Sequence, residues 1–98
     1  MRRVDAIARL KDCAAAVQAR GATLLYLFGS SARDEARPDS DLDLFVDYDP
    51  ARRFSLVDLA AIKNLLQNRL ATEIDVTTRD SLHPLLRDGI VRSAIRVF

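Results

Sequence analysis

Apolar residues recur at helical spacing in two long segments of the chain. Between residues 4 and 19 they stand three or four positions apart, and Gly21 beyond Arg20 is suited to end a helix there. Between residues 55 and 70 a second apolar stripe follows Ser55, which with Asp58 comes close to a capping box. The pattern predicts two amphipathic helices with these inward positions: Val4, Ile7, Leu10 or Ala14, and Val17 in the first, and Leu56, Leu59, Ile62, Leu66 and Leu70 in the second.

Three shorter segments predict strands. Residues 23–28 are continuously apolar and stop at Gly29-Ser30, as expected of a strand buried on both faces. Residues 42–48 alternate acidic and apolar side chains, and residues 73–78 indicate a third strand. A short helix is predicted over residues 31–36 and a helical tail from Ser81 onward. This alternation favours an α/β (α+β) fold in which helices flank a small central β-sheet, and it leaves open whether the sheet is parallel or mixed.

Length, charge and cysteine content narrow the class of protein. With 98 residues the chain is predicted to be a single domain over residues 1–98, and a core this small often relies on a partner chain. The net charge of +1 excludes a strongly basic nucleic-acid-binding surface over the whole molecule. Because Cys13 is the lone cysteine and no leader or membrane-length apolar run is seen, the cytoplasm is the expected compartment.

Two aspartates on the predicted second strand are candidates for binding a metal. Strand side chains alternate, so Asp41 and Asp43 share one face while Leu42 and Leu44 point to the other. Two carboxylates about 7 Å apart along a strand repel each other, and near a core they are tolerated mainly when a cation lies between them. Magnesium suits such a site, because it prefers oxygen ligands and often takes one or two carboxylates with water and phosphates.

Asp75 is a third candidate, on the predicted third strand. If that strand neighbours the second, its carboxylate can join the same face and the three acids could serve two metals, with Asp75 next to an attacking hydroxyl. The alternative is that Asp41 and Asp43 belong to an acidic, solvated edge strand and its turns, as composition alone would suggest.

Gly29-Ser30 is a candidate phosphate-binding loop. It follows a buried strand and precedes a predicted helix, so backbone N–H groups and the Ser30 hydroxyl can receive phosphate oxygens. Arg33, and Arg37 less firmly, could add charged donors to a triphosphate, although solubility explains both equally well.

Other polar residues receive no part in the proposed site. We interpret the spaced arginines of the tail as a solvated face, and His83 before Pro84 as a packing or capping residue. Tyr26 and Tyr48 are interpreted as packing residues of the strands.

Three segments together resemble a known signature. Gly29-Ser30-Ser31-Ala32-Arg33, Ser40-Asp41-Leu42-Asp43-Leu44 and Glu73-Ile74-Asp75-Val76 are similar to the G-S, D-x-D and later Asp of the nucleotidyltransferase superfamily. The chain more narrowly resembles the stand-alone MNT proteins, the antitoxin halves of HEPN/MNT toxin–antitoxin pairs. The likeness runs from the first helix to Leu82-His83-Pro84.

The resemblance implies a mixed-sheet, polymerase-β-like palm and a specific reaction. Gly29 and Ser30 would bind phosphates, Asp41 and Asp43 would bind both metals, and Asp75 would complete the second. Magnesium is then the cofactor and ATP the substrate. AMP is transferred to a tyrosine of a HEPN ribonuclease toxin, and this modification inactivates the toxin.

One departure from the family pattern leaves the function open. After Ala32-Arg33 the family commonly has Gly, whereas this chain has Asp34, whose charge could weaken triphosphate binding. The alternative function is therefore a non-catalytic antitoxin that neutralises the HEPN toxin by binding alone. Nucleotidyl transfer to a small molecule ranks last, because the chain leaves no residues for a second domain to shape the acceptor pocket.

Overall fold

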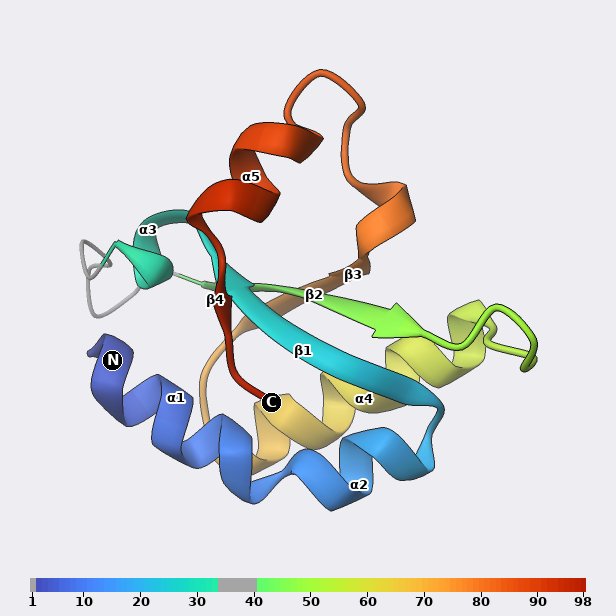
Figure 1. Cartoon of the computed structure of the whole chain (residues 1–98). Helices are drawn as coiled ribbons and strands as arrows, with labels where there is room; N and C mark the ends of the chain where they lie inside the picture. Colours follow the sequence, from blue (N-terminus) through green and yellow to red (C-terminus); the bar gives the residue numbers. More distant parts are fainter. Residues whose placement is uncertain (1, 34–40) are drawn as a thin grey trace.

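A mixed β-sheet is the centre of the fold. The computed structural model describes residues 2–33 and 41–98, and the strands of this part form a four-stranded sheet in the order β3-β2-β1-β4 (Figure 1). β1 is antiparallel to both β2 and β4, whereas β2 and β3 are parallel. The strand bounds are Ala22–Phe28 for β1, Leu42–Tyr48 for β2, Ile74–Thr78 for β3 and Ile95–Arg96 for β4. The prediction of a small mixed sheet with flanking helices is confirmed.

The helices are divided unequally between the two faces of the sheet. α1 (Arg3–Asp12), α2 (Ala14–Ala19) and α4 (Leu56–Leu70) pack against one face. On the other side stand the 3-10 helix η1 (Arg79–Ser81) and α5 (Arg87–Ser93), while α3 (Gly29–Ala32) follows directly on β1 (Figure 1). In the described part of the chain no helix has the length and apolarity to cross a membrane.

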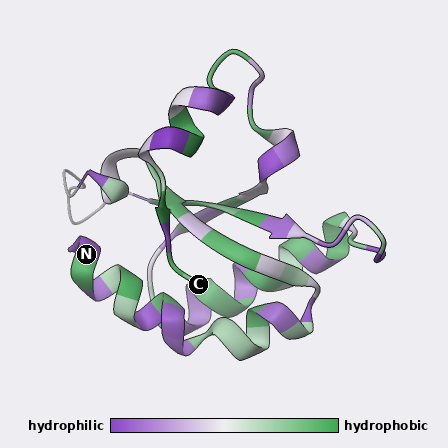
Figure 2. Cartoon of the chain, in the orientation of Figure 1, coloured by the Kyte–Doolittle hydropathy of each residue, from purple (hydrophilic) through white to green (hydrophobic). Residues whose placement is uncertain are grey.

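The main core lies between the sheet and the helices α1, α2 and α4 that cover one of its faces (Figure 1). Figure 2 shows apolar residues concentrated in the strands, whereas the helices alternate between apolar and polar residues. Leu25 and Leu27 of β1 and Leu44 of β2 are fully buried there against Leu10 of α1 and Leu66 of α4. The opposite face of the same strands is therefore available for polar side chains.

Local signals placed the two long helices well, with some corrections. The capping box forms, since Ser55 N–H donates to Asp58 Oδ2 at 3.0 Å and Asp58 N–H to Ser55 Oγ at 3.3 Å. The helix predicted over residues 4–19 is interrupted at Cys13, whose N–H donates to the carbonyl of Leu10 at 3.0 Å. Val4 and Leu56, at the starts of the two stripes, are 63% and 83% exposed, so their predicted burial was wrong.

The C-terminal tail differs most from its prediction. A continuous helix was expected from Ser81, but the segment contains η1, a turn, the short helix α5 and then strand β4. The reason is tertiary: β1 has a free edge, and the tail supplies its hydrogen bonds, with Val97 N–H donating to Leu25 O at 2.8 Å and Leu25 N–H to Phe98 O at 3.1 Å. Pairing of an otherwise exposed strand edge outweighs the local helical pattern.

Candidate functional site

The sheet brings two of the predicted acids together across neighbouring strands. The parallel register of β2 and β3 sets Asp43 opposite Asp75, and Asp41 precedes Asp43 by two residues. The residues that flank the acids along the strands are buried in the main core, so the acids belong to the opposite face; these residues are Leu42, Leu44, Ile74 and Val76. The condition under which Asp75 was expected to join the pair, a neighbouring third strand, is met.

The carboxylate of Asp43 is repelled by those of Asp75 and Asp41. Asp43 is partly buried, while Asp41 and Asp75 are exposed. Burial raises the pKa of Asp43 above its usual value, and the negative charges of Asp75 and then Asp41 raise this pKa further. Ionisation of Asp43 is therefore costly unless positive charge is supplied nearby.

The donor chemistry fits magnesium, but not a complete protein cage. Among residues 2–33 and 41–98, no three His, Cys, Asp or Glu side chains converge closely enough to hold a metal ion by themselves. Carboxylate oxygens are nonetheless the ligands that magnesium takes, one or two at a time, with phosphates and water filling its other positions. The residues fit an ion whose coordination is completed by substrate phosphates.

Gly29 is in direct contact with the acidic centre. Its φ is +71°, and a Cβ built on it would lie 2.5 Å from Oδ2 of Asp43. The left-handed backbone therefore favours glycine here, and any side chain would have to displace the carboxylate of Asp43. β1 and β2 produce this approach, because Phe28, just before Gly29, is paired with Asp43.

The loop after Gly29 is fixed to the rest of the molecule. Ala32 is 5% exposed and belongs to the main core, and its carbonyl accepts a hydrogen bond from Nη1 of Arg3 at 3.1 Å. Ser30 is half-buried, whereas Ser31 is 2% exposed and its Oγ has no hydrogen-bond partner among the described residues. Arg33, predicted to bind the nucleotide, is exposed at the end of α3.

Two predicted features cannot be located in the structure. Asp34, the departure from the family pattern, and Arg37, the second arginine considered for phosphate, lie outside the described residues.

An arginine that sequence reasoning missed covers the middle of the site's face. Phe45 is fully buried against Tyr26, with ring centroids 4.7 Å apart, and the Arg79 guanidinium lies 5.0 Å from the Tyr26 ring and 5.2 Å from the Phe45 ring. Arg79 Nε and Nη2 also donate to the two carboxylate oxygens of Asp47 at 2.7 and 2.9 Å. Asp47 is thus neutralised, whereas Asp43 on the same strand is not. The available signal was the spacing of 75, 77 and 79: the first two lie on one face of β3, and Arg79 follows in the same alternation directly after the strand ends.

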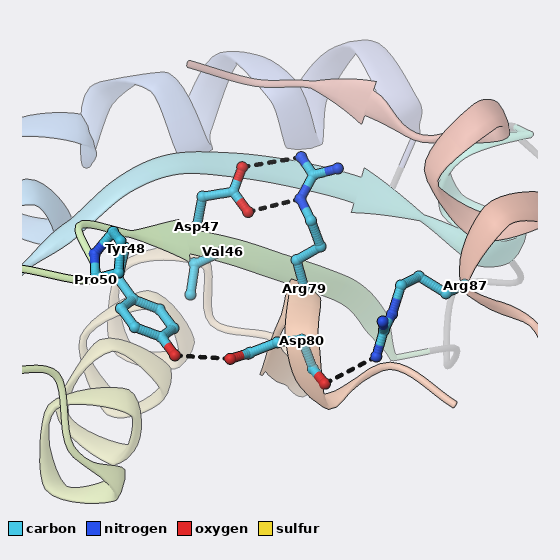
Figure 3. A pocket seen from close by; sticks show the side chains of 7 residues that line it. All are labelled: Val46, Asp47, Tyr48, Pro50, Arg79, Asp80 and Arg87. Atoms are coloured by element: carbon cyan, nitrogen blue, oxygen red, sulfur yellow. Dashed lines mark hydrogen bonds and ion pairs between the residues drawn. The ribbon is translucent and has the colours of Figure 1, made fainter. Parts of the chain in front are cut away.

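The C-terminal end of β2 borders a pocket of about 280 Å³. Figure 3 shows the Arg79–Asp47 pair on one side of it and, on another, the hydroxyl of Tyr48 pointing at Asp80. That hydroxyl donates to Oδ2 of Asp80 at 2.7 Å, and Nη2 of Arg87 donates to the Asp80 carbonyl at 3.0 Å. The hydrogen bonds hold η1 and the segment before α5 against the end of β2.

The remaining residues agree with their structural interpretations. Tyr48 packs as expected, since it stacks on Phe54 with ring centroids 5.0 Å apart. His83 is exposed, and its Nδ1 accepts a hydrogen bond from Leu85 N–H at 3.2 Å, which is the local capping role expected of it.

Comparison with known sequences finds a family match and close relatives. The family model described as "Nucleotidyltransferase domain" matches residues 10–97. A protein of Methanocaldococcus jannaschii provisionally named a protein adenylyltransferase is 42% identical over 71 residues, which cover 72% of this chain and 74% of the relative.

Solved structures share the fold over nearly the whole chain. One provisionally named a minimal nucleotidyltransferase superposes with a TM-score of 0.83 at 37% identity, covering 97% of this chain and 95% of the other. A Shewanella oneidensis complex, described as a tri-AMPylated HEPN toxin with its MNT antitoxin, contains a chain with a TM-score of 0.63 at 18% identity. That match covers 90% of this chain and 68% of the other and supports the fold.

Proposed function

This chain belongs to the nucleotidyltransferase domain family, and from that premise we propose that it is an antitoxin that transfers AMP from ATP to a tyrosine of a HEPN-domain toxin. The observation that carries the proposal is the contact between Gly29 and the carboxylate of Asp43, with Asp75 in register on the next strand. A glycine loop for phosphates and a cluster of acids are thereby joined in one site.

Each residue has a distinct part in the proposed reaction. Gly29 and Ser30 receive phosphate oxygens, and the exposed Arg33 adds positive charge to the triphosphate. Asp41, Asp43 and Asp75 would hold magnesium, which when bound supplies positive charge to the developing negative charge on the phosphates. The metal would also relieve the repulsion that raises the pKa of Asp43.

The transfer is a displacement at the α-phosphorus of ATP. The tyrosine hydroxyl oxygen forms a bond to that phosphorus, the bond between the phosphorus and the oxygen bridging to the β-phosphate breaks, and pyrophosphate leaves. Asp75 is exposed on β3, an edge strand of the described sheet, so an acceptor from a partner can reach it. We assign to Asp75 the position beside the attacking hydroxyl, where its carboxylate can accept the proton.

The partner is inferred from a relative and a structural neighbour. The M. jannaschii relative is named for transfer to protein, and the S. oneidensis complex pairs an MNT antitoxin with an AMPylated HEPN toxin. This chain has the same fold as one chain of that complex and covers 68% of it, so a HEPN-domain protein is the acceptor we propose.

A second candidate, neutralisation by binding alone, has one observation in its favour. The described acids do not by themselves form a metal-binding cluster. Mg²⁺ would therefore bind only together with the nucleotide, and a chain that binds no nucleotide would hold no metal. An antitoxin with a vestigial site would keep the same fold and the same partner.

The test is incubation of the chain with α-³²P-labelled ATP, Mg²⁺ and its cognate HEPN protein, followed by gel autoradiography and intact mass. We expect the HEPN protein to gain one or more AMP units. Asp43→Asn should abolish labelling, whereas the matched control Asp47→Asn changes an acid of the same strand that is already paired with Arg79 and should retain it.

The outcomes separate the two candidates. If wild type gives no label but forms a stable complex that blocks the toxin, and Asp43→Asn blocks it equally, then the binding-only function holds. If both aspartate variants lose labelling to the same extent while remaining folded, the assignment of Asp43 to the reaction is wrong.

A further inference from the structure

The face of the sheet that carries the acids also has a basic groove. A depression of about 500 Å³ is lined by Arg79, Arg87, Asp88, Val91 and Arg92, between η1 and α5. It adjoins the pocket at the end of β2, since Arg79 and Arg87 line both. From sequence alone the arginines of the tail were interpreted as a solvated face, but the fold directs three arginines of the chain to one place.

The three arginines of the groove differ in how their charge is balanced. Arg79 is engaged by the carboxylate of Asp47, but in the described part of the chain neither Arg87 nor Arg92 forms an ion pair. Arg87 donates to the carbonyls of Asp80 and Leu82, and Arg92 donates to the carbonyl of Asp88. These acceptors are neutral, and the lining holds three arginines against one acid, Asp88. Asp80 beside the groove offsets part of this charge, since hydrogen bonds from Thr78 and Tyr48 and then the charge of Arg87 lower its pKa.

Arg87 is also incompletely satisfied. Its Nε is buried and has no hydrogen-bond partner among the described residues. A buried unpaired donor costs free energy, but this atom is closed to solvent and therefore also to a ligand in the groove. What Arg87 offers a carboxylate in the groove is its positive charge, with the guanidinium held in place by the carbonyls of Asp80 and Leu82.

Apolar residues beside the groove favour a protein as its occupant. Leu85 and Leu86, directly before α5, are 88% and 59% exposed. Adjacent large apolar side chains next to arginines are typical of a protein-binding surface and are not needed by a nucleic acid or a free anion.

The distance between Asp75 and the groove determines which residue of the partner, counted from the acceptor tyrosine, can reach the arginines. Asp75 and Thr77 lie on one face of β3, and Arg79, the first residue of η1, has its guanidinium over Phe45 of the neighbouring strand. Four residues of extended chain span about 13 Å. An acceptor tyrosine next to Asp75 would be followed by extended chain of the same rise, so a residue about four positions away would meet the arginines.

We propose that the groove of Arg79, Arg87 and Arg92 is an acceptor-side subsite that binds an acidic residue about four positions from the tyrosine to be modified. The inference rests on the proposed function, because it specifies the acceptor of that reaction. It makes the tail helix α5 a determinant of which tyrosine is used, separate from the acids that carry out the transfer.

The first test measures binding without any transfer. Fluorescein-labelled poly(Glu,Tyr), a random copolymer in which acids surround each tyrosine, is titrated by anisotropy with wild type, Arg92→Glu and Arg9→Glu in EDTA. Arg9 is exposed on α1, which covers the opposite face of the sheet, so both variants change the net charge equally. We expect Arg92→Glu to weaken binding about tenfold or more and Arg9→Glu at most about twofold. If both variants weaken binding equally, the binding depends only on the net charge of the protein, and the proposal is overturned.

The second test reads specificity in the reaction. Tyrosine peptides with Glu or Gln four residues from the tyrosine are labelled by wild type and by Arg92→Glu with Mg-ATP. We expect the Glu peptide to have a KM about tenfold lower than the Gln peptide for wild type, and no preference for Arg92→Glu. Affinity for a fluorescent ATP analogue should be unchanged by Arg92→Glu. Loss of that affinity would assign the groove to the nucleotide and refute the proposal.

Failure of this inference and failure of the proposed function give different results. If wild type labels no acceptor but poly(Glu,Tyr) binding depends on Arg92, the transferase function fails and the acidic-segment subsite stands. If labelling of the HEPN protein is intact and its KM is the same for wild type and Arg92→Glu, the function stands and the subsite is wrong.

Discussion

Gly29→Ala should uncouple catalysis from stability more clearly than any other single substitution in the site. The new methyl group faces two penalties at once. A φ of +71° costs an L-residue about 1 kcal/mol relative to glycine. The built Cβ lies 2.5 Å from Asp43 Oδ2, a contact that must open to at least 3.0 Å.

The displacement of Asp43 or the Gly29 loop predicts both a loss of transfer rate and a loss of stability. Moving the Asp43 carboxylate or the loop by about 0.5–1 Å displaces groups that must align with the triphosphate, and a misplacement of this size can cost about a hundredfold in rate. The strain should lower the free energy of unfolding by about 1–2 kcal/mol, and a domain of this length loses about 4–8 °C in Tm for each kcal/mol.

Two other glycines provide matched controls. Gly21 has φ +106°, and a Cβ there would lie 3.2 Å from Cδ1 of Phe54, so Gly21→Ala should lose comparable stability and keep its labelling activity. Gly89 lies in α5 with no neighbour within 4 Å of the built Cβ, so Gly89→Ala should raise stability by up to about 1 kcal/mol.

The assay combines thermal unfolding with initial rates of AMP transfer at saturating ATP. If Gly29→Ala and Gly21→Ala lose the same activity for the same loss of Tm, the rate effect follows stability alone. In that case the reasoning from the Gly29–Asp43 contact is refuted.

Three further substitutions test the electrostatics and the ends of α4. The pKa of Asp43 is raised, so its contribution to stability is present below its ordinary value of 3.8 and is lost as pH rises through the raised value. Asp43→Asn should therefore be more stable than wild type in urea with EDTA at pH 7, with the gap closing toward pH 3.8; an unchanged gap across this range would contradict the assigned cause. Ser55→Ala removes the capping box with Asp58 and should cost about 1 kcal/mol in urea unfolding without changing the transfer rate, and a loss below about 0.3 kcal/mol would mean that the cap adds little. Ala71 ends α4 with φ +53°, so Ala71→Gly should raise Tm by an amount equivalent to about 0.5–1 kcal/mol, whereas a lower Tm would show that its methyl group has a packing role.

The amino-acid sequence determined those features that depend on near neighbours. β2 was predicted with its observed bounds, because alternation of Asp43 and Leu44 along an extended chain fixes which side chain faces the core. The start of α4 followed from Ser55 and Asp58, since a capping box is complete within four residues. Gly29-Ser30 was identified by its place after a buried strand. The sequence did not show that the carboxylate of Asp43 lies against Gly29.

Only the tertiary structure decided which of these features meet. Local periodicity cannot tell which strands are neighbours, so the register of Asp43 with Asp75 came from the parallel pairing of β2 and β3. Arg79 was missed because its partner Asp47 is 32 residues away. The tail was predicted as a helix because its apolar spacing is helical, but residues 95–97 gain more by completing the edge of β1. Hydrogen bonds and charges between distant segments depend on how the chain is packed, and packing is a property of the whole fold that no short window of sequence contains.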